Sequence, residues 1–169
     1  SEKRRAGAVQ GGVRVRLLVA HTNGGGENRL RKLEQRMLEA GVTVTRTGDE
    51  FVRYHCKMVI IDRQSLWVLG FNFTALDTTR SRSFGIVTRQ KTDVLQALRL
   101  FEADATKQPF EPSGHNFVVS PENARENLSR FIGQAKKQLR AGTQHGRERF
   151  EHGAGKLRGI AVGIDVVAG

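Results

Sequence analysis

This chain has little cysteine and no long apolar run, and each of these shortages excludes a class of structure. Cys56 is the single cysteine among 169 residues, which excludes an intrachain disulfide framework and a zinc site built from several cysteines. Neither a metal nor a cofactor is expected. There is no run of about 18 apolar residues to span a bilayer and no charged-then-apolar leader. We expect a protein of the cytoplasm or of a membrane surface, with its true N-terminus unknown because the chain starts at Ser1.

Acidic residues are outnumbered by basic ones. The chain has 28 Lys and Arg against 17 Asp and Glu, which gives a formal net charge of +11. Such an excess indicates an anionic partner: nucleic acid, phospholipid head groups or a phosphorylated small molecule. Charge alone does not choose among these.

Apolar periodicity predicts an α/β fold, with a mixed central β-sheet flanked by helices. An apolar strand over 13–20, an amphipathic helix over 27–41 and a short strand over 42–45 form a β-α-β unit. The later elements expected are strands over 51–62, 66–71, 84–88 and 116–120 and helices over 92–105 and 120–140.

Composition divides the chain into five parts. Two of the three prolines lie in one short stretch, which predicts a linker. The expected parts are a basic flexible segment (1–12), a catalytic domain (13–106), the linker (107–115), the start of a second half (116–140) and an atypical tail that is non-native to the fold or disordered (141–169).

A small set of polar residues carries the chemistry. His55 and Lys57 are two apart in the predicted strand over 51–62, so their side chains point to the same side. An ammonium group in an otherwise apolar strand is costly to bury unless an anion meets it. The next strand returns antiparallel and delivers Asn72, after Gly70, close to the His-Lys end. We interpret the cluster as a phosphodiester site without a metal.

The order His55-x-Lys57-x4-Asp62, followed by Gly70-x-Asn72, resembles the signature of the phospholipase D superfamily. The flanking residues are similar to those of cardiolipin synthase-like bacterial proteins. The resemblance implies a phospholipase D-type half-domain, a phosphohistidine intermediate, and hydrolase or phosphatidyltransferase activity on phospholipids. It implies these roles: His55 as nucleophile or acid, Lys57 and Asn72, with Gly70, as phosphate ligands, and Asp62 as a supporting residue that alternation turns away from the His-Lys face.

Two features depart from the superfamily pattern. Members carry two motifs that face each other, so that one His attacks while the other protonates the leaving group, whereas this chain carries one. It is a fragment or frame-shifted product of a two-motif enzyme, a single-motif protein completed by homodimerisation, or an inactive anion-binding half-domain. Many members also place an acidic residue about eleven positions after the Asn, where this chain offers Ser81 and Ser83.

A homodimeric nuclease is the alternative activity, and nucleic acid is the less favoured partner.

Three other features are interpreted structurally. The glycine turn at 24–26 lacks the order of a phosphate-binding loop. Cys56 alternates to the face opposite His55 and is expected to pack. His21 is expected to be a surface residue in the loop after the first strand.

Overall fold

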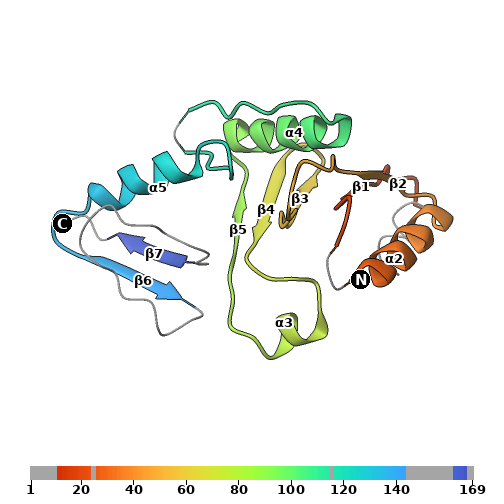
Figure 1. The fold of residues 1–169 in the computed structure, drawn as a ribbon, viewed down its shortest axis with the longest axis horizontal. Helices are drawn as coiled ribbons and strands as arrows, with labels where there is room; N and C mark the ends of the chain where they lie inside the picture. The colour runs from red at the N-terminus through yellow and green to blue at the C-terminus, as the bar shows by residue number, and fades with distance from the viewer. Residues whose placement is uncertain (1–10, 24–25, 115, 144–161, 167–169) are drawn as a thin grey trace. The chain divides into compact units, whose positions relative to one another are not determined.

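The computed structural model describes residues 11–23, 26–114, 116–143 and 162–166, and the chain divides into two compact units, Ser1–Phe117 and Val118–Gly169. Figure 1 shows the helices and strands of both units. Each unit is described by itself. The predicted linker over 107–115, with a domain on either side, stays a prediction.

The first unit opens with the predicted β-α-β arrangement. Strands β1 (Arg16–Val19) and β2 (Thr43–Arg46) pair in parallel, with helix α2 (Glu27–Glu39) between them. The helix ends because Gly41 adopts φ 79°, a left-handed conformation that glycine takes without steric cost. Val19, Met37 and Val42 are buried beneath this unit's surface.

A three-stranded antiparallel sheet follows, in the order β3-β4-β5. Its strands are β3 (Met58–Ile61), β4 (Ser65–Leu69) and β5 (Gly85–Thr88). Asp62 and Arg63 form the turn between the first two, with φ values of 52° and 56°, and the Gln64 N–H donates to the Ile61 carbonyl at 2.9 Å. Two left-handed central residues are the type I′ geometry that matches strand twist. The predicted hairpin is confirmed.

Helix α4 (Lys91–Thr106) covers one face of this sheet and also contacts β1 (Figure 1). Leu66, Val94 and Ala97 form the buried core between them, and Met58, Ile60, Leu98 and Phe117 pack against it. Arg16 of β1 pairs with Glu102 and lies 5.0 Å from the centre of the Phe101 ring. The α/β class, with sheet strands flanked by helices, is therefore confirmed.

One prediction for the motif region needs correction. The strand expected over 51–62 is regular only over Met58–Ile61, and β3 lies at the edge of its sheet while β4 is central. Pairing is limited by the partner, because β4 ends at Leu69 and Gly70 then bonds to Phe84 of the next segment. Short helix α3 (Ala75–Thr79) was not predicted.

The second unit contains α5 (Ala124–Gly133), β6 (Leu139–Thr143) and β7 (Val162–Val166), the two strands antiparallel. Residues 116–120, which were predicted to form a strand, are described and form bends and a turn instead. Asn123 explains the late helix start, since its side chain accepts from the Val119 N–H at 2.8 Å and its own N–H donates to the Val119 carbonyl at 3.0 Å. Much of the predicted tail lies outside the described residues.

In the described part of the chain, no helix combines the length and apolar character needed to cross a membrane.

Replacing Leu66 with Ala tests the core beneath α4. Leu66 is 2% exposed, so the truncation removes buried surface and leaves a cavity, and we expect the free energy of unfolding to fall by about 2–5 kcal/mol. Leu95→Ala is the matched control, because Leu95 lies on α4 itself and has 60% of its surface exposed. That change is expected to cost less than about 0.5 kcal/mol in denaturant unfolding. Equal losses would contradict the described packing.

Candidate active site

His55 and Lys57 lie in the extended segment immediately before β3. The first ladder bond of the hairpin runs from the Leu69 N–H to the Lys57 carbonyl at 2.9 Å, so Lys57 marks the point where pairing begins. The Lys57 Nζ lies 2.9 Å from Nε2 and 3.1 Å from Nδ1 of His55, and 3.1 Å from the His55 carbonyl oxygen. The structure thus places the ammonium group against the imidazole, on one side of the backbone.

The charges around His55 favour its neutral form. Partial burial, the Lys57 ammonium and the Arg53 guanidinium together lower the pKa of His55 below its usual range. A neutral imidazole has a nitrogen lone pair that can accept from an ammonium group or attack an electrophile. Burial and Arg53 also lower the pKa of Lys57, while Cys56 and Asp77 act in the opposite direction. Two cations beside one neutral imidazole make a site suited to an anion.

Gly70 and Asn72 follow β4 at the end of the sheet that carries Lys57. The Gly70 N–H donates to the Phe84 carbonyl at 3.0 Å, and a Cβ at this position would lie 3.1 Å from that same oxygen. Gly70 therefore lets the chain pass close to the segment before β5, and its N–H is already used. Asn72 is exposed just beyond it. A substrate-binding role for either residue stays a prediction.

Asp77 is a site residue that the sequence reasoning missed. Hydrogen bonds from the side chains of Asn72 and Thr74 lower the pKa of the Asp77 carboxyl group, with smaller contributions from the Asn72 N–H and the Lys57 charge. The Asp77 N–H in turn donates to Thr74 Oγ1 at 3.1 Å, which caps α3. The Asp77 carboxylate thus restrains the Asn72 amide and lies within range of the Lys57 charge. Thr-x-x-Asp is a helix-capping pattern, and that signal was available in the sequence.

Asp62 lies at the other end of β3 from His55 and Lys57. Its φ of 52° places it in the tight turn to β4, where it is exposed. Asp and Asn tolerate this conformation better than most residues. The placement supports a turn role, and the supporting catalytic role expected from the superfamily pattern stays a prediction.

Three further features were expected from the sequence to be structural. His21 is exposed after β1, where its N–H donates to Thr47 Oγ1 at 3.0 Å. Cys56 is an exposed residue, although alternation predicted that it would pack. Of the glycine turn at 24–26, Gly26 alone lies in the described part of the chain.

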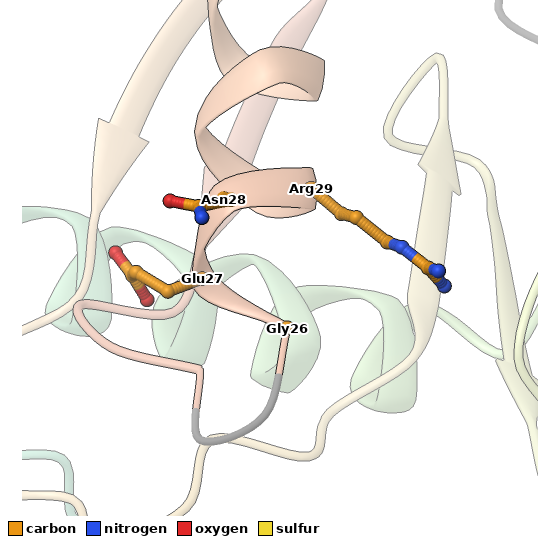
Figure 2. A pocket seen from close by; sticks show the side chains of 4 residues that line it. All are labelled: Gly26, Glu27, Asn28 and Arg29. Carbon is orange, nitrogen blue, oxygen red and sulfur yellow. The ribbon is translucent and has the colours of Figure 1, made fainter.

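A pocket of about 410 Å³ opens at the start of α2, lined by Gly26, Glu27, Asn28 and Arg29 (Figure 2). None of the motif residues lines it. The Glu27 carboxylate accepts from the Asn23 N–H at 2.7 Å and pairs with Arg31 at 2.7 Å. An acidic side chain at this helix start competes with any anion for the same N–H groups.

Among the described residues, no group of three or more His, Cys, Asp or Glu side chains is arranged to hold a metal ion.

Comparison with known proteins identifies one family. Residues 5–105, more than half of the chain, match the family described as "Cardiolipin synthase, PLD-like domain". The match contains β1 to β5 and nearly all of α4, and it includes every motif residue discussed above. No curated protein and no solved structure gives a significant match.

Lys57→Met tests the electrostatics of the pair. The change keeps the length of the side chain and removes a positive charge beside His55, so the pKa of His55 should rise towards its ordinary value of about 6.5. The pKa is measured by following the imidazole proton signals through an NMR titration, with His55→Ala used for assignment. Lys91→Met, at the exposed start of α4, is the control and should leave that pKa unchanged. A lower or unchanged pKa in Lys57→Met would contradict the described contact.

Asp77→Asn tests whether the carboxylate restrains Asn72. The change replaces a charged acceptor with a neutral amide oxygen and so weakens the bond from Asn72, which should speed hydrogen exchange of the Asn72 side-chain amide by about tenfold. The rate is read from the NMR signals of that amide. Asp49→Asn alters an exposed carboxylate elsewhere and should have no effect. Unchanged exchange in Asp77→Asn would remove Asp77 from the site.

Proposed function

Because the chain belongs to the family of cardiolipin synthase PLD-like domains, within the phospholipase D superfamily, we propose that it cleaves or exchanges phosphodiester bonds of phospholipids. Members of this superfamily generally catalyse phosphodiester reactions. The observation that carries the proposal is the contact between the Lys57 ammonium and the His55 imidazole, whose pKa is lowered so that it is neutral near pH 7.

The proposed reaction has two steps at phosphorus. In the first, a ring nitrogen of neutral His55 attacks, a P–N bond forms, and the P–O bond to the leaving alcohol breaks as that oxygen takes up a proton from an acid. In the second step, water or another alcohol attacks phosphorus and gives its proton to the group that acted as the acid. The P–N bond then breaks and His55 is released. Water gives hydrolysis, whereas an alcohol gives phosphatidyl transfer.

Lys57 and Asn72 are proposed to hold the non-bridging phosphate oxygens. The ammonium group supplies the charge, and the Asn72 amide, held by Asp77, supplies a directed donor. Preorganised donors of this kind stabilise the charge that develops in the transition state because they need no rearrangement. Arg53, which lowers the pKa of both His55 and Lys57, adds positive charge nearby. In this proposal, Gly70 contributes by allowing close approach of the backbone, and Asp62 supports the strand end.

The acid for the leaving group is proposed to come from a second histidine supplied by another copy of the chain or by a second half of the enzyme. His21 and His55 are the histidines in the described residues, and His21 lies after β1 with its backbone bonded to Thr47. Superfamily members pair two motifs, and many do so as dimers. A homodimer at a membrane surface, with the net charge of +11 attracting anionic lipid, is the arrangement we favour.

The test measures turnover by the purified chain over a range of protein concentrations in EDTA. The substrates are vesicles of phosphatidylglycerol and phosphatidylcholine, a chromogenic phosphodiester, and linear DNA. We expect release of the lipid head group, with a specific activity that rises with concentration if a second copy completes the site. His55→Ala should lower turnover by at least about a thousandfold, whereas the control His21→Ala should retain it.

Each alternative has its own outcome. DNA cleavage without lipid turnover would replace this proposal with a nuclease of the same superfamily. Phosphate or lipid binding without turnover of any of the three substrates would leave an anion-binding domain instead of an enzyme.

The pH dependence follows from the state of the two imidazoles. His55 must be neutral, so activity should fall as the pH drops through its lowered pKa, which places the acid limb below about pH 6.5. The partner imidazole must be protonated, so activity should also fall at high pH. The profile of kcat/KM against pH is the measurement, and a flat profile from about pH 5 to 9 would contradict the mechanism.

A further inference from the structure

Tyr54, the residue before His55, is tied to helix α4. Its hydroxyl group donates to Asp104 Oδ2 at 2.9 Å, across 50 positions of sequence. Asp104 lies near the end of α4 and is 7% exposed, and among the described residues it is the charged side chain that the fold buries. The Tyr54 ring is half-buried, and its centre lies 5.9 Å from that of Phe51. A buried carboxylate on a packed helix therefore anchors the segment that carries the motif.

The same anchor reaches the residue after His55. Although Cys56 as a whole is exposed, its thiol bonds to Tyr54, and local burial followed by the Asp104 charge raises the pKa of that thiol. Burial and the neighbouring Cys56 and Asp104 groups also raise the pKa of Tyr54 far above its usual range, so its hydroxyl keeps its proton. Tyr54 thus contacts the Asp104 carboxylate directly, and Cys56 lies within range of its charge.

Backbone alternation explains what this anchor achieves. Tyr54 and Cys56 share the parity of Met58 and Ile60, which pack against the core beneath α4. His55 and Lys57 have the opposite parity and project from the other side, where they meet each other. Regular pairing starts only at Lys57, so the preceding residues depend on side-chain contacts. Holding Tyr54 against the helix through Asp104 restricts the direction in which His55 points.

We propose that Asp104 and Tyr54 are positioning residues, which hold His55 and Lys57 in their reactive arrangement from the opposite side of the segment before β3. This inference rests on the proposed function for its effect on turnover, but the positioning itself can be measured without any substrate. Neither residue is assigned a step in the chemistry. Both act through the placement of the imidazole.

The variants are Tyr54→Phe, which removes only the hydroxyl group, and Asp104→Asn, which removes the charge and keeps the shape. Asp93→Asn is the control, because Asp93 lies in the first turn of the same helix and accepts from Thr88 Oγ1 at 3.2 Å. The pKa of His55 is measured by NMR titration in each protein. Tyr54→Phe is expected to fold even if the buried site does not tolerate Asp104→Asn.

The direction in which the pKa of His55 changes distinguishes a loss of positioning from a simple charge effect. Partial burial and the charges of Lys57 and Arg53 lower the pKa of His55, so an imidazole released from this arrangement should regain a higher value. Losing the negative charge of Asp104 through space would do the opposite and lower it further. We expect a rise in both variants and no change in Asp93→Asn. An unchanged or lower value in Tyr54→Phe would overturn the proposal.

Kinetics supply the second measurement. Misplacing a catalytic group by about 1 Å can cost roughly a hundredfold, so kcat should fall by about tenfold to a hundredfold in either variant, with KM changed by less than about threefold. The double variant should be no slower than the slower single one, because both changes break one contact. If the pKa rises but the wild-type chain turns over no substrate, the positioning stands and the proposed function fails. Wild-type kcat in Tyr54→Phe would overturn the catalytic importance of the anchor.

Discussion

Helix α4 packs on the sheet through Ala97, which is completely buried in one cluster with Leu66 and Val94, and the arrangement of the first unit depends on this contact. The small Ala side chain lets the helix lie close to the sheet, because any larger group there would push the two apart. From that position α4 contacts β3 and β4 through the core and β1 through the pair of Arg16 and Glu102. The parallel and antiparallel strand pairs are thereby held by one helix.

The same packing gives the candidate site its two sides. One side of the segment before β3 is anchored, through Tyr54, to the buried Asp104 carboxylate of α4. The other side presents His55 and Lys57 in contact, with the pKa of both groups lowered. A cation beside a neutral imidazole is a poor arrangement for folding alone, since neither group neutralises the other. The pair carries a net positive charge, which suits the binding of an anion.

Local patterns predicted the parts of this fold whose causes are local. The first helix ended at Gly41 as expected, and the two strands of the hairpin run antiparallel as predicted. The strand over 51–62 was predicted too long because its pairing is limited by the length of β4, which the strand's own residues do not encode. The bend at 116–120 likewise depends on Asn123.

The candidate site was predictable to a similar extent. The spacing of His55 and Lys57 correctly placed their side chains together. Asn72 follows β4 at the expected end, but its restraint by Asp77 was not predicted, because the superfamily pattern places an acidic residue further along the chain. The contact of Tyr54 with Asp104 could not be predicted, since it joins residues 50 apart whose meeting depends on where α4 lies.

The central claim is that His55 forms a covalent bond to phosphorus, and trapping that bond tests it most directly. Protein mixed with phosphatidylglycerol vesicles would be quenched in denaturant at alkaline pH, where a phosphoramidate survives, and digested for peptide mass spectrometry. The account predicts a phosphatidyl adduct on the peptide containing His55, which is lost on acid treatment and absent from His55→Ala. An adduct on another residue, or turnover by His55→Ala at the wild-type rate, would contradict it.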